Sequence, residues 1–379
     1  MAKVKYFNQE RSPMAELGFE TPLGVRVVVA GREMDYFSGT SYLGLHNHPD
    51  VQEAAIQAIR RYGMSTATSR GGYGEHLLYD ELEAEARRFF NSPAVLLYPS
   101  GYLSALVLAH GLRPRVERAF VDESAHYSVF DGVRAAGLPL VPFRHLDGQS
   151  LRETLRGELK PGERPLVFSD GLFPISGEIA PLPDYLEVLG EYEGWRLGLD
   201  DAHAAGVLGP NGRGTLEHHA IQSANCLAGA TLSKALGGFG GLLPGPGELI
   251  AEIQRGAKVY AGASPIPLPN AAGSAAALRL ARTQPERLAR LRTNLGQVRA
   301  GLRTQGWQVE ESPSPIVCLR AGPGLDLGQI RAHLFASGIC IAHVTSYSST
   351  PPGGALRIAV CASHQSAQIE RLLEALGRS

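Results

Sequence analysis

The chain has 379 residues, enough for two or three domains and a sizeable hydrophobic core. Its 36 basic and 37 acidic residues leave a net charge of −1, which argues against nucleic-acid binding because such proteins usually carry a clear basic excess. Apolar residues form 44% and charged residues 19% of the chain, which excludes an intrinsically disordered protein.

Targeting and cysteine patterns favour a cytoplasmic protein without a metal. The sequence has no run of about 18 apolar residues and no apolar N-terminal stretch, so we expect neither a membrane span nor a signal peptide. The cysteines are widely spaced and form no CxxC pair, which disfavours a disulfide framework and a zinc site. They are Cys226, Cys318, Cys340 and Cys361.

In the first two thirds of the chain, helical periodicity alternates with short apolar runs, a pattern typical of an α/β fold with a mainly parallel sheet. Apolar residues at helical spacing predict helices over 48–63 and 80–90, the second with Asp80 as its N-cap. Strands are predicted at Ala94–Tyr98, Arg118–Val121, Pro165–Phe168, Arg196–Leu199 and Cys226–Ala230.

A smaller α+β domain is predicted after these strands. A Gly- and Pro-rich stretch from Gly237 to Gly247 is expected to close the large domain, and a helical segment then runs from 264 to about 301. Strands at Ile316–Leu319 and Ala355–Val360 then alternate with helices at Leu327–Ser337 and Ser366–Leu376. We expect an N-terminal arm over 1–45, a large domain over 46–265 and a small domain over 266–379.

Polar side chains gather after the predicted strands of the large domain. In open α/β sheets, ligands bind just beyond the carboxyl ends of the strands. The residues at such positions are Ser100, His126, Asp170, Asp200, His203 and Lys234. This coincidence predicts a binding site at that edge of the sheet.

Lys234 follows a strand of small apolar residues and precedes a run of glycines. A lysine is more often a solvated surface cation, and glycines more often form a flexible loop. A desolvated amine, however, loses its charge readily and can form a Schiff base. The glycines would then let the backbone approach a flat, phosphorylated ligand.

Asp200 and His203 form the second motif, Asp-Asp-Ala-His. A carboxylate at a strand end suits a protonated ring nitrogen, and a Schiff-base lysine with an aspartate partner is the combination that binds pyridoxal phosphate. His203 could bond the ring oxygen. The alternative is a helix N-cap aspartate beside a structural histidine.

Two weaker signals accompany these motifs. Ser100, Gly101 and Tyr102 lie between a strand and a helix, where free backbone N–H groups can bind a phosphate, although such turns are common. His126 could stack on a flat cofactor and act as an acid or base, although a single histidine is more often structural.

The order and spacing of the motifs resemble the α-oxoamine synthase family of fold-type-I pyridoxal phosphate enzymes. The resemblance extends from about Phe37 to His364. Its matching motifs include Tyr42–Leu45, Ser100–Tyr102, Asp122–His126, Asp200–His203, Thr231–Lys234 and Leu356–Ile358. It implies a large domain with a mainly parallel seven-stranded sheet, a smaller C-terminal α+β domain, and a homodimer with its active site at the subunit interface.

The resemblance also implies residue roles in binding and catalysis. Lys234 would bind pyridoxal phosphate covalently and take the α-proton of the substrate. Asp200 would pair with the ring nitrogen and His203 with the ring oxygen, while His126 would stack on the ring and polarise the thioester oxygen. Contacts to the phosphate or ring would come from Ser100, Gly101, Tyr102 and Thr231.

Substrate contacts are implied for Arg357 and Thr40. Arg357 matches the arginine that holds the amino acid carboxylate, a task suited to its planar fork, although a surface charge at a strand end is the alternative. Thr40 stands where the family usually has a substrate-binding asparagine. The other departures from the family pattern are Tyr79, Pro174, Ser176, Ala204–Ala205 and Ala261–Gly262, the last of which Ser264 could compensate.

The predicted reaction is a decarboxylative condensation of glycine, alanine or serine with an acyl-CoA thioester, giving an α-aminoketone, CoA and CO2. The departures at Thr40, Pro174 and Ser176 motivate an alternative on the same cofactor, such as an aminotransferase, a retro-aldol enzyme or a racemase. A non-catalytic subunit is a third hypothesis, disfavoured because Lys234 and its partners Asp200 and His203 are all present.

Overall fold

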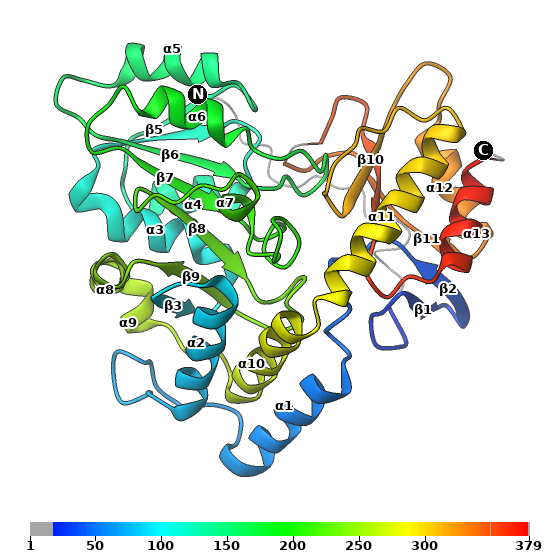
Figure 1. Ribbon diagram of the computed structural model, residues 1–379, viewed down its shortest axis with the longest axis horizontal. Coiled ribbons are helices and arrows are strands. Elements are labelled where there is room, and N and C mark those ends of the chain that lie inside the picture. Colours follow the sequence, from blue (N-terminus) through cyan, green and yellow to red (C-terminus); the bar gives the residue numbers. More distant parts are fainter. Residues whose placement is uncertain (1–17, 349, 378–379) are drawn as a thin grey trace.

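The computed structural model describes residues 18–348 and 350–377. A larger half is built around a seven-stranded sheet, and a smaller half around two three-stranded sheets; both are seen side by side in Figure 1. The large sheet has the order β3 (Ala94–Tyr98), β9 (Gly241–Gly245), β8 (Cys226–Thr231), β7 (Arg196–Asp200), β6 (Pro165–Asp170), β4 (Arg118–Asp122) and β5 (Leu140–Phe143). Only β9 is antiparallel to its neighbours, so the predicted mainly parallel seven-stranded sheet is confirmed.

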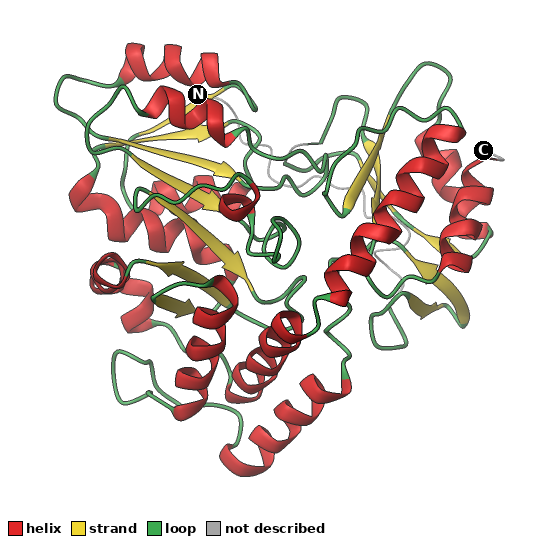
Figure 2. Cartoon of the chain, viewed as in Figure 1, coloured by secondary structure: helices red, strands yellow, loops and turns green. Residues whose placement is uncertain are grey.

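The five predicted strands of this sheet are present, and four of them extend into the polar residues that follow. Asp122, Asp170, Asp200 and Thr231 are the last residues of β4, β6, β7 and β8. Asp170 and Asp200 are direct partners in the β6–β7 register. The strand arrows of β6, β7 and β8 point toward the smaller half (Figure 2), so these polar ends lie at the boundary of the two halves.

The stretch Gly237–Gly247, which is expected to close the large domain, contains the strand β9, which was not predicted. Its two leucines are fully buried in the sheet. Pro244 is tolerated because β8 pairs only with Gly241 and Leu242, so no hydrogen bond to β8 is required of the missing N–H. Strand β5 was not predicted either.

Helices cover both faces of the large sheet. They are α1 (Pro49–Tyr62), α2 (Leu77–Phe90), α3 (Ser104–Leu112), α4 (Tyr127–Ala135), α5 (Gly148–Glu158), α6 (Leu182–Leu189), α7 (Thr215–His218), α8 (Gly247–Gly256), α9 (Lys258–Gly262) and α10 (Leu268–Thr283), with 3-10 turns at Gly101–Leu103 and Arg113–Arg115. Within the described ranges, no helix is long and apolar enough to cross a bilayer.

Two helix predictions need correction. Asp80 is not an N-cap, because α2 begins at Leu77 and the side chain of His76 accepts the hydrogen bond from the Leu78 N–H. The helical segment predicted up to about 301 is two helices, α10 and α11 (Glu286–Thr304), separated at Pro285. A proline in a helix interior removes one hydrogen bond and clashes with the preceding turn, which explains the break.

The smaller half combines the first and the last segments that the structure describes. One sheet has the order β10 (Ile316–Arg320), β13 (Ala355–Ala359) and β12 (Ala342–Val344), and α11, α12 (Leu327–Ala336) and α13 (Ser366–Gly377) accompany it. In the other sheet, the hairpin of β1 (Arg26–Val29) and β2 (Arg32–Tyr36) pairs with β11 (Ile339–Cys340). The described part of the expected N-terminal arm is therefore packed on the smaller half (Figure 1), and the domain boundaries stay predictions.

Candidate active site

A cavity of about 160 Å³ lies at the carboxyl ends of the large sheet. All eight residues predicted to bind the cofactor line it: Ser100, Gly101, Tyr102, His126, Asp200, His203, Thr231 and Lys234. They come from turns that are widely separated in sequence but adjacent at one sheet edge. Of the two predicted substrate residues, neither Arg357 nor Thr40 lines this cavity.

Lys234 lies in the turn after β8 and is half-buried. Burial lowers the pKa of its amine to about 8, although the carboxylates of Asp200 and Asp170 act in the opposite direction. A substantial fraction of the amine is therefore uncharged in mildly alkaline solution, the state required for attack on a carbonyl carbon.

The glycines after Lys234 contact protein and not the cavity. A Cβ atom at Gly237, whose φ is +64°, would lie 2.5 Å from the Cβ of Leu45. A Cβ at Gly238 would lie 2.1 Å from the Oγ of Ser274 in α10. These two glycines let the turn pack against neighbouring segments, and the expectation that the glycines admit a ligand stays a prediction.

Two carboxyl groups, Asp170 and Asp200, lie side by side at the ends of β6 and β7. Burial, together with the neighbouring charge of Asp200, raises the pKa of Asp170 well above its usual range. Its Oδ1 accepts a hydrogen bond from the backbone N–H of His126 at 3.0 Å. Asp170 therefore positions His126, and Asp200 is the carboxylate available to a protonated ring nitrogen.

His203 is held in one tautomer by Tyr42, a residue that the sequence indicated only as part of a motif. The Tyr42 hydroxyl lies 2.8 Å from Nδ1 of His203 and accepts a hydrogen bond from Nη2 of Arg357 at 3.0 Å. Burial raises the pKa of Tyr42 to about 12 and lowers that of His203 well below its usual range, so both are neutral. The phenol donates to Nδ1, which leaves the proton of His203 on Nε2.

Arg357 is buried on β13 behind the cavity wall. Its Nε donates to the carbonyl oxygen of Pro174, a cavity residue, at 2.6 Å, and its Nη1 donates to the carbonyl oxygen of Ser38 at 3.2 Å. With the bond to Tyr42, these contacts use three of its five N–H groups. Arg357 is not the surface charge of the alternative hypothesis.

Thr40 lines a separate hollow of about 270 Å³ with His46 and Ser363. Two of the other departures also lie outside the cavity. Tyr79 is buried and donates to the carbonyl oxygen of Ile266, and Ser176 lines a groove between the two halves. Pro174 is thus the departure that touches the cavity directly.

His126 presents a flat ring to the cavity at the N-terminus of α4. Its Nδ1 accepts from the backbone N–H of Ser128 at 3.3 Å, which places the ring proton on Nε2. Burial lowers its pKa, so the neutral form dominates near neutral pH. The ring lies 4.0 Å from that of Tyr127, centroid to centroid.

The turn after β3 forms a close-fitting cradle. A Cβ atom at Gly101 would lie 2.6 Å from the Cβ of Thr231, so a larger residue would push the turn away from the end of β8. The side chain of Ser100 caps this turn by accepting from the Tyr102 N–H. The cradle, the lysine of lowered pKa and the carboxylate together fit pyridoxal phosphate, and the individual residue roles stay predictions.

Comparisons with known proteins agree with this arrangement. The family model described as aminotransferase class I and II matches residues 37–376. The chain therefore belongs to this family of pyridoxal phosphate enzymes, and within it to the α-oxoamine synthases.

Two similar proteins bear the name 8-amino-7-oxononanoate synthase. The one from Methylococcus capsulatus is 35% identical over 359 residues, covering 94% of this chain and 92% of that protein. The one from Nitrosococcus oceani is also 35% identical, with 94% of each chain covered. Among solved structures, serine palmitoyltransferase from S. paucimobilis with a bound PLP–myriocin aldimine has a TM-score of 0.88 and 26% identity, and covers 96% of this chain and 91% of that chain.

Proposed function

We propose that the protein condenses alanine with a seven-carbon dicarboxylic acyl thioester and releases CoA and CO2. The observation that carries the proposal is the cavity in which Lys234, Asp200, His203 and His126 meet, in a chain that is 35% identical to synthases of 8-amino-7-oxononanoate. In that product, carbons 8 and 9 with the amino group are alanine without its carboxylate. Carbons 1–7 are the acyl part, with a second carboxylate at its end.

Asp200 and His203 serve to bind the cofactor, and Lys234 serves to transfer a proton. When bound, pyridoxal phosphate supplies an electron sink that stabilises negative charge at the α-carbon of the amino acid. Asp200 would keep the nitrogen of the bound ring protonated, and the Nε2–H of His203 would donate to the ring oxygen. The amine of Lys234 removes the α-proton, a step for which its lowered pKa of about 8 is suited.

Substrate positioning falls to residues at the boundary of the two halves. Arg357 binds the amino acid carboxylate with the N–H groups that its protein contacts leave over. The Nε2–H of His126 donates to the acyl oxygen while the new carbon–carbon bond forms and CoA leaves. Of the departures that motivated the aminotransferase alternative, Thr40 and Ser176 lie outside the cavity, which weakens that alternative.

We also propose a homodimer in a reducing cytoplasm. Five large apolar side chains close together in sequence are exposed on the larger half, and such side chains suit burial against a second copy of the chain. They are Ile56 and Ile59 on α1 with Met64, Tyr73 and Leu77 on the following segment. The four free cysteines are consistent with a reducing compartment.

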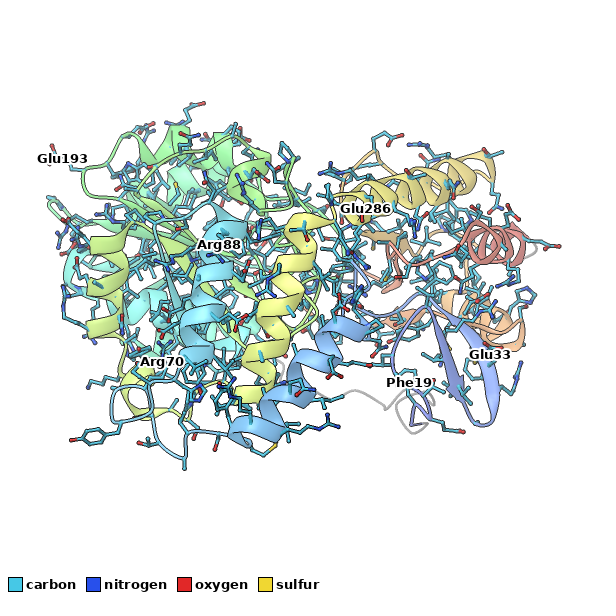
Figure 3. The ribbon with its side chains drawn as sticks, turned by 60° about the horizontal axis from the view of Figure 1, so that its bottom comes forward. Phe19, Glu33, Arg70, Arg88, Glu193 and Glu286 are labelled. Carbon is cyan, nitrogen blue, oxygen red and sulfur yellow. The ribbon has the colours of Figure 1, made fainter. Side chains whose placement is uncertain are left out.

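The segment between α1 and α2 that carries some of these exposed side chains is anchored to the larger half. Arg70 precedes α2 in the chain and lies beside one end of that helix (Figure 3), and its Nη1 donates to Oε1 of Glu83 at 2.6 Å. Its guanidinium also lies 4.9 Å from the ring centre of Tyr79. These contacts fix the backbone of the segment that carries the exposed apolar side chains. Light scattering of the purified protein tests the dimer, and a monomer at micromolar concentration would contradict it.

The reaction is tested by titrating the loaded enzyme with glycine, alanine and serine before adding acyl-CoA thioesters of several lengths. We expect alanine to shift the visible absorption of the cofactor, and free CoA thiol to appear only with the seven-carbon diacid thioester. Conversion of the cofactor to its pyridoxamine form without any acyl-CoA would support the aminotransferase instead.

A further inference from the structure

Tyr347 reaches from the smaller half to the histidine of the cavity. It lies on the connection between β12 and β13, and its hydroxyl is 2.8 Å from Nε2 of His126, a contact between residues 221 positions apart. Its ring centre lies 5.7 Å from those of both His126 and Tyr127. No motif of the sequence indicated this residue.

The hydrogen positions follow from three contacts of the imidazole: Nδ1 lies 3.3 Å from the backbone nitrogen and 2.7 Å from Oγ of Ser128, and Nε2 lies 2.8 Å from the Tyr347 hydroxyl. Because Nδ1 of His126 accepts from the backbone N–H of Ser128, its ring proton is on Nε2 and points at the Tyr347 oxygen. Burial, with a hydrogen bond to Tyr127, raises the pKa of Tyr347, so the phenol stays protonated. The phenol therefore accepts from His126 and keeps its own proton for Tyr127.

We propose that Tyr347 is a positioning residue for His126, whose phenol oxygen holds the Nε2–H in the direction required by the incoming acyl oxygen. Nδ1 is committed to the N-cap of α4, so Nε2 carries the only N–H that this ring can donate. Before the acyl donor binds, the phenol oxygen of Tyr347 accepts the hydrogen bond from the Nε2–H of His126. The acyl oxygen then replaces the phenol oxygen as the acceptor. No bond is made or broken at Tyr347.

The same connection leads directly into β13, which carries Arg357. Tyr347, which orients His126, and Arg357, which we assign to the amino acid carboxylate, thus lie on one short stretch of the smaller half. Recognition of the amino acid and preparation for the acyl donor are therefore made by one segment. This inference rests on the proposed function for its kinetic consequence, but not for the contact itself.

The test compares Tyr347→Phe with Tyr192→Phe, in which a phenol hydroxyl is removed from the loop between α6 and β7, far from His126 along the large sheet. The first readout is histidine ring NMR of the loaded full-length enzyme, with the His126 signal identified by its loss in His126→Asn. We expect the Nε2 proton to exchange with water at least about tenfold faster in Tyr347→Phe, because one hydrogen bond is lost. In Tyr192→Phe the exchange rate stays that of the wild type.

The second readout is kinetic. We expect kcat of Tyr347→Phe to fall about tenfold while the KM for the acyl donor does not rise and the amino acid binds as before. Unchanged exchange with unchanged kcat would overturn the proposal, as would an equal change in Tyr192→Phe. If the wild type turns over no acyl-CoA at all, the proposed function fails, and the NMR comparison alone still decides the role of Tyr347.

Discussion

The larger half lines the cavity, and the smaller half contacts that lining from behind: Tyr347 lies 2.8 Å from His126, and Arg357 donates to the carbonyl oxygen of Pro174. The large sheet supplies Asp170, Asp200 and Lys234 at or just beyond the ends of neighbouring strands, where backbone pairing sets their spacing. The smaller half supplies Arg357 from a three-stranded sheet and Tyr347 from a connection. The groups that we assign to the cofactor thus lie on the large sheet, and the residue that we assign to the amino acid carboxylate lies on the smaller half.

The largest effect is expected from Lys234→Ala, which removes a group from the large sheet. Loss of the covalent bond and of the base should lower turnover by roughly 1,000-fold or more, while the protein still folds. Visible absorption after dialysis checks whether the cofactor remains covalently bound. Lys258→Ala, on an exposed residue of α9, is the matched control. Full turnover in Lys234→Ala would contradict the assigned role.

The second-largest effect is expected from Arg357→Lys, which changes a group of the smaller half. A lysine keeps the charge but loses the planar fork, so the amino acid should bind about 10- to 100-fold more weakly, while the cofactor is retained. The shift of the cofactor spectrum on titration with alanine measures this affinity. Arg303→Lys on α11 serves as the control. If Arg357→Lys weakened the binding of both the cofactor and the amino acid, the separate assignment of the two binding tasks to the two regions would be contradicted.

Next in size is Gly101→Ala, which tests the cradle of the larger half. The added Cβ would lie 2.6 Å from the Cβ of Thr231, so the turn must shift, at a cost of about 1–3 kcal/mol. We expect about tenfold weaker binding of pyridoxal phosphate, measured by titration of the cofactor-free protein. Gly157→Ala is the matched control, since nothing lies within 4 Å of its Cβ. Equal affinities in the two variants would count against the cradle.

How far the sequence predicts these two regions follows from how each is built. Asp200 and Lys234 could be predicted because each follows a short apolar strand, and strand ends meet at one sheet edge. Tyr42 and Tyr347 could not be assigned roles, because their hydrogen bonds join residues 161 and 221 positions apart. Strand β9 was missed because its glycines and proline are typical of a turn.

The smallest effect concerns ion pairs of the larger half that continue to Arg320 of the smaller half. His145 lies 2.9 Å from Asp122 and 3.4 Å from Glu178, and Glu178 lies 2.9 Å from Arg320 on β10. Although burial alone would lower it, these carboxylates raise the pKa of His145 to about 9 from an unfolded value near 6.5. The stabilisation is therefore complete below pH 6.5 and is lost as the pH rises through 9.

Denaturant unfolding at pH 6 and pH 9.5 tests this sign. The free energy of unfolding of the wild type should fall by about 1 kcal/mol more than that of His145→Gln between the two pH values. A parallel fall in the two proteins would mean that the ion pairs of His145 do not stabilise the fold.

The most direct test of the central claim is the mass of the product formed from alanine and the CoA thioester of the seven-carbon diacid. The account predicts 8-amino-7-oxononanoate, with one CoA thiol and one CO2 released for each molecule formed. A product that retains the carboxylate of alanine, or pyruvate formed without consumption of thioester, would contradict it.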